Sequence, residues 1–101
     1  MTAARQKLEI LVDRPLAARI AKIADAVGVS GYTILPTLSG SGHGGHWSDD
    51  QITGATAKVM FWTVTTEDKA RAFLAELSPL LDSHGLLVTS HAVDVIRDAK
   101  F

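Results

Sequence analysis

The chain has 101 residues, of which 47 % are hydrophobic and 21 % are charged, with a formal net charge of -1. This is the composition of one globular domain over residues 1–101, long enough to bury a core without disulfides or metals. The low charge, with Lys and Arg scattered, argues against nucleic acid and anionic membranes as partners. The chain has no cysteine, which excludes disulfides and thiolate metal sites. With no apolar leader and no membrane-length apolar run, the sequence predicts a cytoplasmic protein.

The first part of the chain predicts a strand, a helix and a second strand. Residues 7–12 alternate between apolar and polar, which is typical of a strand. A helix then begins at Pro15, where the missing N–H is tolerated, and ends at Gly28. Residues 30–38 predict a second strand. Pro36 within this strand indicates an edge position, because proline cannot donate a hydrogen bond to a neighbouring strand.

The second part predicts a strand, a helix and a final strand. Residues 57–64 form the third predicted strand. Residues 65–68 resemble a capping box and start a helix. Pro79 is expected to kink or restart that helix, because a proline inside a helix removes a hydrogen bond. Gly85 ends the helix, and residues 86–96 predict the fourth strand.

The order β-α-β-β-α-β is typical of a ferredoxin-like α+β sandwich, in which a four-stranded antiparallel sheet carries two helices on one face. Met60, Trp62 and Val64 lie on one face of the third strand. Val59 and Phe61 lie on the other, so both faces of the sheet are apolar. A monomer would leave one of these faces in water. We therefore expect burial against another subunit.

The most informative segment is residues 40–45, in which four of six residues are glycine. Glycine adopts positive φ and lets another molecule approach the backbone, whereas a plain hairpin needs only two turn residues. The segment matches G-x-G-x-x-G, but it opens no helix in a βαβ unit, and no Gly-Lys-Ser/Thr of a phosphate-binding P-loop follows. Two interpretations stay open: a loop whose N–H groups hold an anion, and a flexible hairpin tip.

Three polar or aromatic residues in this segment or directly after it suggest rival functions. His43 and His46 could bind Zn, Cu or Ni in a trimeric metal-binding protein, although a solvated loop is favoured because their spacing matches no known ligand pair. Trp47 could stack on a ligand or anchor a partner in an interaction module, or it could fold back onto the domain. No catalytic triad or acid/base pair is recognisable, so an enzyme ranks last.

Several segments resemble the PII signalling proteins and their PII-like relatives. Residues 10–16, Ile-Leu-Val-Asp-Arg-Pro-Leu, are similar to the first strand and proline-started helix of the family. Residues 31–45 resemble the second strand and the base of the regulatory T-loop, which would span about residues 39–56. Residues 93–97, Val-Asp-Val-Ile-Arg, are similar to the last strand.

This resemblance implies a homotrimer with adenine-nucleotide clefts between its subunits and no resident cofactor. The T-loop would change conformation to engage a partner protein, such as a transporter or an enzyme. Six residues fall at nucleotide-contacting positions: Val12, Thr33, Gly40, Gly42, His43 and Arg97. Contacts of the loop with an anion or a partner are expected from Gly44, Gly45 and Trp47.

The sequence departs from the nitrogen-regulating members of the family in three places. His43 stands where they carry arginine, and Asp-Ser-His-Gly at residues 82–85 replaces their Gly-Asp-Gly-Lys phosphate grip. Each lost charge-assisted contact, worth roughly 1.5–3 kcal/mol, disfavours ATP most. Tyr32, the only tyrosine, belongs to the second predicted strand, so uridylylation of the loop is not expected. The pattern is most similar to the PII-like branch, including carboxysome-associated forms, with AMP, ADP or bicarbonate as effectors.

Overall fold

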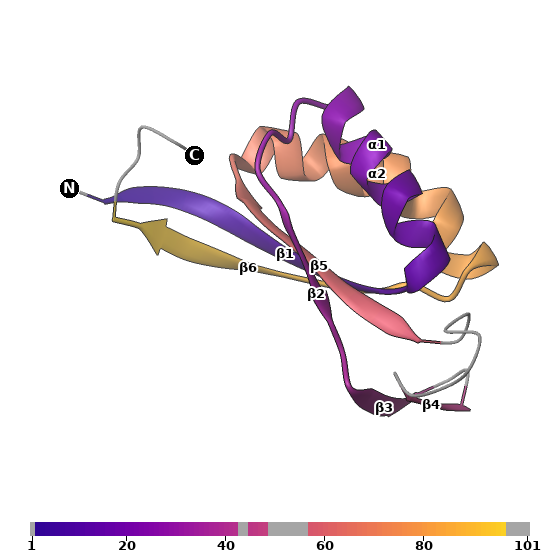
Figure 1. Cartoon of the computed structure of the whole chain (residues 1–101). Helices are drawn as coiled ribbons and strands as arrows, with labels where there is room; N and C mark the ends of the chain where they lie inside the picture. The colour runs from indigo at the N-terminus through magenta and orange to yellow at the C-terminus, as the bar shows by residue number, and fades with distance from the viewer. Residues whose placement is uncertain (1, 43–44, 49–56, 97–101) are drawn as a thin grey trace.

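The computed structural model describes residues 2–42, 45–48 and 57–96. In this part of the chain, four strands form an antiparallel sheet in the order β2-β5-β1-β6, and two helices cover one face (Figure 1). The strands of this sheet are β1 (Ala3–Asp13), β2 (Thr33–Pro36), β5 (Lys58–Thr65) and β6 (Leu87–Val95). The helices are α1 (Ala17–Ala26), entered through the 3-10 turn η1 (Arg14–Leu16), and α2 (Glu67–Ser83). The ferredoxin-like α+β prediction is confirmed.

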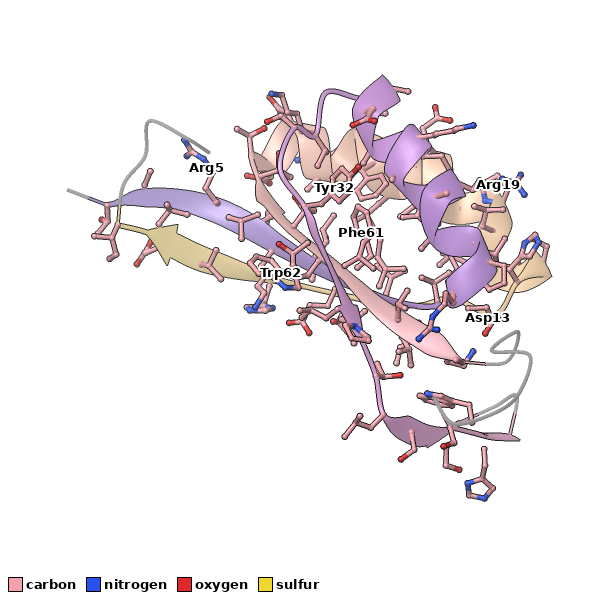
Figure 2. All side chains as sticks on the ribbon, in the orientation of Figure 1. Arg5, Asp13, Arg19, Tyr32, Phe61 and Trp62 are labelled. Carbon is pink, nitrogen blue, oxygen red and sulfur yellow. The ribbon has the colours of Figure 1, made fainter. Side chains whose placement is uncertain are left out.

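The hydrophobic core lies between the sheet and the helices, because alternate strand residues point to one face. β1 presents Leu8, Ile10 and Val12 to the helices, and all three are buried. Phe61 of β5 lies in the same layer (Figure 2). Its ring centroid is 6.0 Å from that of Phe73 in α2. This burial fixes the position of β1 and β5 relative to the two helices.

The helices begin and end where the sequence predicts, with one difference at the start of α2. Proline in the first turn leads into α1, and Gly28 follows that helix with φ of 85°. The Thr66 side chain caps α2 by accepting from the backbone N–H of Lys69 at 3.3 Å. Because a lysine occupies the third helical position, the reciprocal bond of a capping box is missing. None of the helices described is long and apolar enough to span a membrane.

Pro79 does not restart the second helix, because α2 continues through it to Ser83. Phe73, Leu77 and Leu80 are buried on the core side of α2, before and after the proline. Packing of this stripe supports the last turn of α2, although proline has no backbone N–H to donate. Of the two outcomes predicted for Pro79, a kink or a restart, the restart is therefore wrong.

The second predicted strand, residues 30–38, is shorter in the structure, where β2 spans only Thr33–Pro36 and a separate hairpin follows. β2 lies at the edge of the sheet, which confirms the position predicted from Pro36. The chain then forms a two-stranded antiparallel sheet of β3 (Ser39–Gly42) and β4 (Gly45–Ser48), which projects from the end of β2 (Figure 1). Gly45 has φ of 99°, a conformation that favours glycine. The described residues of the glycine segment thus belong to two paired strands.

The face of the sheet opposite the helices carries one apolar row across all four strands. The strand register aligns Leu35, Met60, Leu11 and Leu87 in this row. Leu35 is 43 % exposed and Leu87 is 59 % exposed. We call Leu35, Met60, Leu11 and Leu87 the open-face row.

Candidate functional site

A pocket of about 330 Å³ lies where the β3–β4 hairpin meets the sheet and the turn after α2. The hairpin contributes Ser41, Gly42 and Trp47 to its lining, and the sheet contributes Leu11 and Lys58. Small-molecule sites typically enclose ~300–1,000 Å³. The pocket therefore has the volume of a small ligand site.

The opposite wall of the pocket comes from the end of α2 and the turn into β6. Gly85 ends the turn with φ of 61°, which allows the chain to reverse at once into the strand. Leu81, Leu86 and Leu87 line the pocket on this side. The wall is apolar, as the flat face of an aromatic ligand requires.

Trp47 folds back onto the domain. It is 8 % exposed, and its indole Nε1 donates to the Thr37 Oγ1 at 2.9 Å. The Thr37 hydroxyl in turn donates to the Lys58 carbonyl oxygen at 2.6 Å. Of the orientations that the sequence left open, the structure has the indole packed on its own subunit.

Two glycines of β3 have different surroundings. A Cβ atom at Gly40 would lie 2.2 Å from the Cη2 and Cζ2 atoms of Trp47, so the indole fills the space of a side chain there. A Cβ atom at Gly42 would meet no atom within 4 Å. Gly42 therefore borders open space at the pocket, whereas Gly40 is covered by the Trp47 ring of the same subunit.

Lys58 is the cationic group among the described residues that line this pocket. Its Nζ atom lies 2.7 Å from the Asp13 Oδ1 and 5.4 Å from the centroid of the Trp47 ring. An ammonium beside an apolar wall and a glycine backbone suits an anionic ligand with a flat apolar part.

The structure brings only part of the implied nucleotide positions to this pocket. Gly42 lines it, and Gly40 lies one layer away beneath Trp47. Val12 is buried in the core, while its neighbour Leu11 reaches the pocket. Thr33 pairs with Trp62 on β5 and does not line the pocket.

Three of the remaining predicted site residues, His43, Gly44 and Arg97, lie outside the described residues. Gly45 pairs with Gly42 at the start of β4, and His46 is exposed opposite Ser41.

The described residues contain no group of three or more His, Asp or Glu side chains able to hold a metal ion. The His43–His46 site stays a hypothesis.

Sequence reasoning missed the pocket residues that lie outside the glycine segment. Lys58 begins a strand, and nothing in the local pattern marks it as a site residue. Gly85 is predicted only as the end of a helix, and Leu86 and Leu87 directly follow it. A signal was available in the topology, because a βαββαβ order places the start of β5 and the start of β6 on either side of β1.

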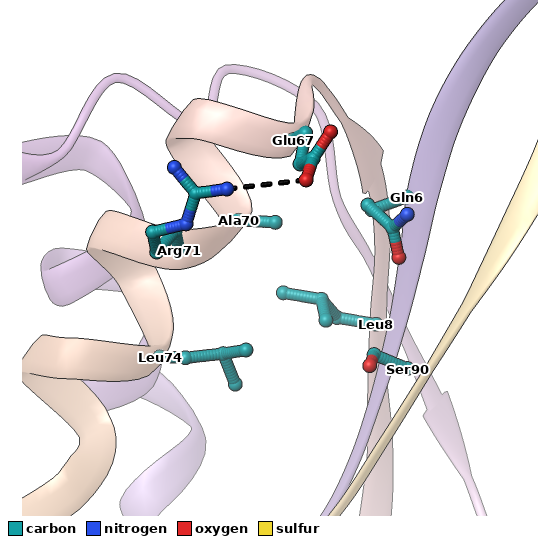
Figure 3. Close-up of a pocket in the computed structure, with 7 residues that line it drawn as sticks. All are labelled: Gln6, Leu8, Glu67, Ala70, Arg71, Leu74 and Ser90. Carbon is teal, nitrogen blue, oxygen red and sulfur yellow. Dashed lines mark hydrogen bonds and ion pairs between the residues drawn. The ribbon is translucent and has the colours of Figure 1, made fainter.

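A second, smaller hollow of about 240 Å³ lies between the first turns of α2 and the strands β1 and β6 (Figure 3). Gln6, Leu8 and Ser90 line it from the sheet. Its cation, Arg71, is engaged by Glu67 at 3.1 Å and by Asp68 at 3.5 Å. None of the implied nucleotide positions that the structure describes lines this hollow. The pocket at the hairpin is therefore the better candidate site.

Comparison with known families and structures gives one consistent result. The family model described as nitrogen regulatory protein P-II matches residues 5–100. A search of curated proteins finds no match. Structures of CPII, a nitrogen regulatory PII-like protein from Thiomonas intermedia K12, superpose on almost the whole chain.

Three of these CPII structures differ in what they bind. One, bound to ADP, AMP and bicarbonate, has a TM-score of 0.91 and 27 % identity and covers 100 % of this chain and 96 % of that chain. One bound to ADP and bicarbonate has a TM-score of 0.88 and 28 % identity and covers 100 % and 97 %. One bound to ADP, AMP and acetate has a TM-score of 0.83 and 29 % identity and covers 100 % and 97 %.

Proposed function

The chain belongs to the nitrogen regulatory P-II family, and we propose that it is a regulatory protein that binds an adenine nucleotide in the pocket between the β3–β4 hairpin and the turn after α2. The observation that carries this proposal is the position of Gly42, which lines a pocket of about 330 Å³ without any neighbour in the space of its side chain. The similar protein CPII binds ADP, AMP and bicarbonate.

The lining of the pocket suits the two parts of a nucleotide. Leu81, Leu86 and Leu87 offer an apolar surface to a purine ring. The Lys58 ammonium and the backbone of Gly42 offer charge and N–H groups to the phosphates. With one cation in the described lining, AMP and ADP bind more tightly than ATP. The Lys58 ammonium and the Gly42 backbone N–H also suit bicarbonate, which is a small anion.

Regulation follows from the place of the ligand beside the hairpin. A nucleotide that contacts β3 favours one arrangement of the T-loop-like segment at residues 39–56 and so changes the surface offered to a protein partner. The partner is a transporter or an enzyme, and this chain itself supplies no catalysis and holds no resident cofactor. We place the protein in the cytoplasm, as its sequence predicts.

A homotrimer completes this proposal. Leu11 and Leu87 belong both to the open-face row and to the lining of the pocket. A subunit packed on the open face would therefore lie against the rim of the nucleotide site. This arrangement places the ligand at a cleft between subunits.

The test is isothermal titration calorimetry with AMP, ADP and ATP, each with and without bicarbonate. We expect micromolar binding near one nucleotide per subunit, with AMP or ADP tighter than ATP. Gly42→Val should abolish binding because its side chain enters the pocket, while the assembly stays intact. Gly31→Val is the matched control, since a Cβ there also meets nothing within 4 Å and Gly31 does not line the pocket. Full affinity in the Gly42→Val protein would contradict this site.

A further inference from the structure

We propose that Trp47 is a positioning residue whose indole latches the glycine strand β3 against the sheet, and that position 40 is glycine to admit this indole. The inference rests on the proposed function, because the strand that Trp47 holds is the one that borders the nucleotide pocket. It assigns Gly40 a role within the subunit instead of a contact with the ligand.

The hairpin register sets up the contact. Gly40 and Trp47 are directly opposite each other in the antiparallel pair, so their side chains would share one face of the hairpin. The indole crosses the partner strand and lies over Gly40, where a Cβ atom would be 2.2 Å from two ring atoms. A rigid indole can restore an ordinary van der Waals distance to such a Cβ atom only by moving out of its present position over Gly40. Any side chain at position 40 therefore displaces the indole.

The latch is anchored outside the hairpin. The indole Nε1 donates to the Thr37 hydroxyl at 2.9 Å, and this hydroxyl donates to the Lys58 carbonyl oxygen of β5 at 2.6 Å. Thr37 also donates its backbone N–H to the same carbonyl, at 3.3 Å. One continuous series of contacts thus joins the main sheet to the far strand of the hairpin.

The hairpin needs such an anchor. Two-stranded hairpins are marginally stable on their own, and glycine in a strand weakens it further. β3 has the sequence Ser-Gly-Ser-Gly and offers no apolar side chain of its own. Trp47 is the buried side chain among the described residues of β3 and β4. Its packing therefore fixes where Ser41 and Gly42 stand at the pocket.

Lys58 joins the latch to the charge in the pocket. Its ammonium lies 5.4 Å from the indole centroid, within the range of a cation–π contact. An anionic ligand that attracts this ammonium changes the surroundings of the indole. Trp47 emission should consequently respond to nucleotide binding.

A double-mutant cycle tests the latch. All proteins carry Trp62→Phe, which leaves Trp47 as the only tryptophan. We expect Gly40→Ala to weaken ADP binding at least tenfold in calorimetry, to shift Trp47 emission to longer wavelength and to raise its quenching by acrylamide. In proteins that also carry Trp47→Ala, the further change Gly40→Ala should alter ADP affinity less than twofold, because the ring that clashes is gone. Equal effects of Gly40→Ala in both backgrounds would overturn the proposal.

Two further variants separate latching from general damage. Thr37→Val removes the acceptor of the indole N–H and should weaken ADP binding, whereas Thr37→Ser keeps the hydroxyl and should restore it. Gly31→Ala is the matched control and should leave emission and affinity unchanged. If the parent protein binds no nucleotide, the proposed function fails. Trp47 emission and its quenching by acrylamide still test whether the indole holds β3 against the sheet. Unchanged Trp47 emission in Gly40→Ala would refute the latch whatever the nucleotide does.

Discussion

At the residue scale, the pocket depends on the charge of Lys58. Its ammonium is held by Asp13 at 2.7 Å, with side chains that are 20 % and 40 % exposed respectively. An ion pair this open to water contributes at most about 1 kcal/mol to stability. The same ammonium facing a phosphate makes a charge-assisted hydrogen bond worth roughly 1.5–3 kcal/mol. Its contribution to binding should therefore exceed its contribution to folding.

Replacing Lys58 by methionine keeps the apolar stem and removes the charge. We expect Lys58→Met to weaken ADP binding at least tenfold, since a loss of about 1.4 kcal/mol is a factor of ten. Asp13→Asn should leave the affinity unchanged or raise it, because the ammonium is then free for the ligand. Calorimetry with ADP measures both, and Lys22→Met on the exposed side of α1 is the matched control. ADP binding as tight in Lys58→Met as in the parent would show that the phosphates lie elsewhere.

At the element scale, α2 contains a local conflict that its packing overrides. Pro79 is exposed and lies inside the helix, while Leu77 and Leu80 on either side of it are buried. A proline within a helix removes one backbone hydrogen bond, crowds the carbonyl of residue i−4 and costs about 3 kcal/mol. We expect Pro79→Ala to raise the free energy of unfolding by about 1–3 kcal/mol. The measurement is urea unfolding at one fixed protein concentration, since assembly shifts apparent stability.

The control for this prediction is the neighbouring residue. Ser78 is also exposed in α2, so Ser78→Ala should change the free energy of unfolding by less than about 0.5 kcal/mol. A Pro79→Ala protein no more stable than its parent would mean that the last turn of α2 gains nothing from a regular hydrogen-bonding pattern.

The same element scale explains what the sequence could predict and what it could not. Alternating and helical patterns are local, so the helices, the long strands and the edge position of Pro36 were predictable. The β3–β4 hairpin was missed because glycine and serine carry no strand pattern. Its order comes from Trp47 packing on Gly40, a contact that appears only once the hairpin has formed. Lys58 joined the candidate site only through topology, which brings the start of β5 beside the turn after α2.

At the scale of the whole molecule, the open face of the sheet has two different halves. The open-face row is apolar, whereas the other half carries charged side chains. There the Lys7 Nζ lies 5.0 Å from the centroid of the Trp62 ring and 3.7 Å from the Glu9 Oε1. The apolar half is the one that continues into the pocket through Leu11 and Leu87. Assembly and nucleotide binding are therefore expected to depend on the same surface.

Met60 stands in the middle of the open-face row, paired with Leu35 on one side and Leu11 on the other. We expect the parent protein to elute as a trimer, three times the 10.8 kDa chain, in size-exclusion chromatography with light scattering. Met60→Glu should give monomers, because an unpaired carboxylate buried between subunits costs several kcal/mol. Arg19→Glu, on the exposed side of α1, should leave the trimer intact.

Since the pocket rim is shared with this face, the Met60→Glu monomer should also bind ADP at least tenfold more weakly, although Met60 does not line the pocket. Monomers that keep the full ADP affinity would place the whole nucleotide site within one subunit.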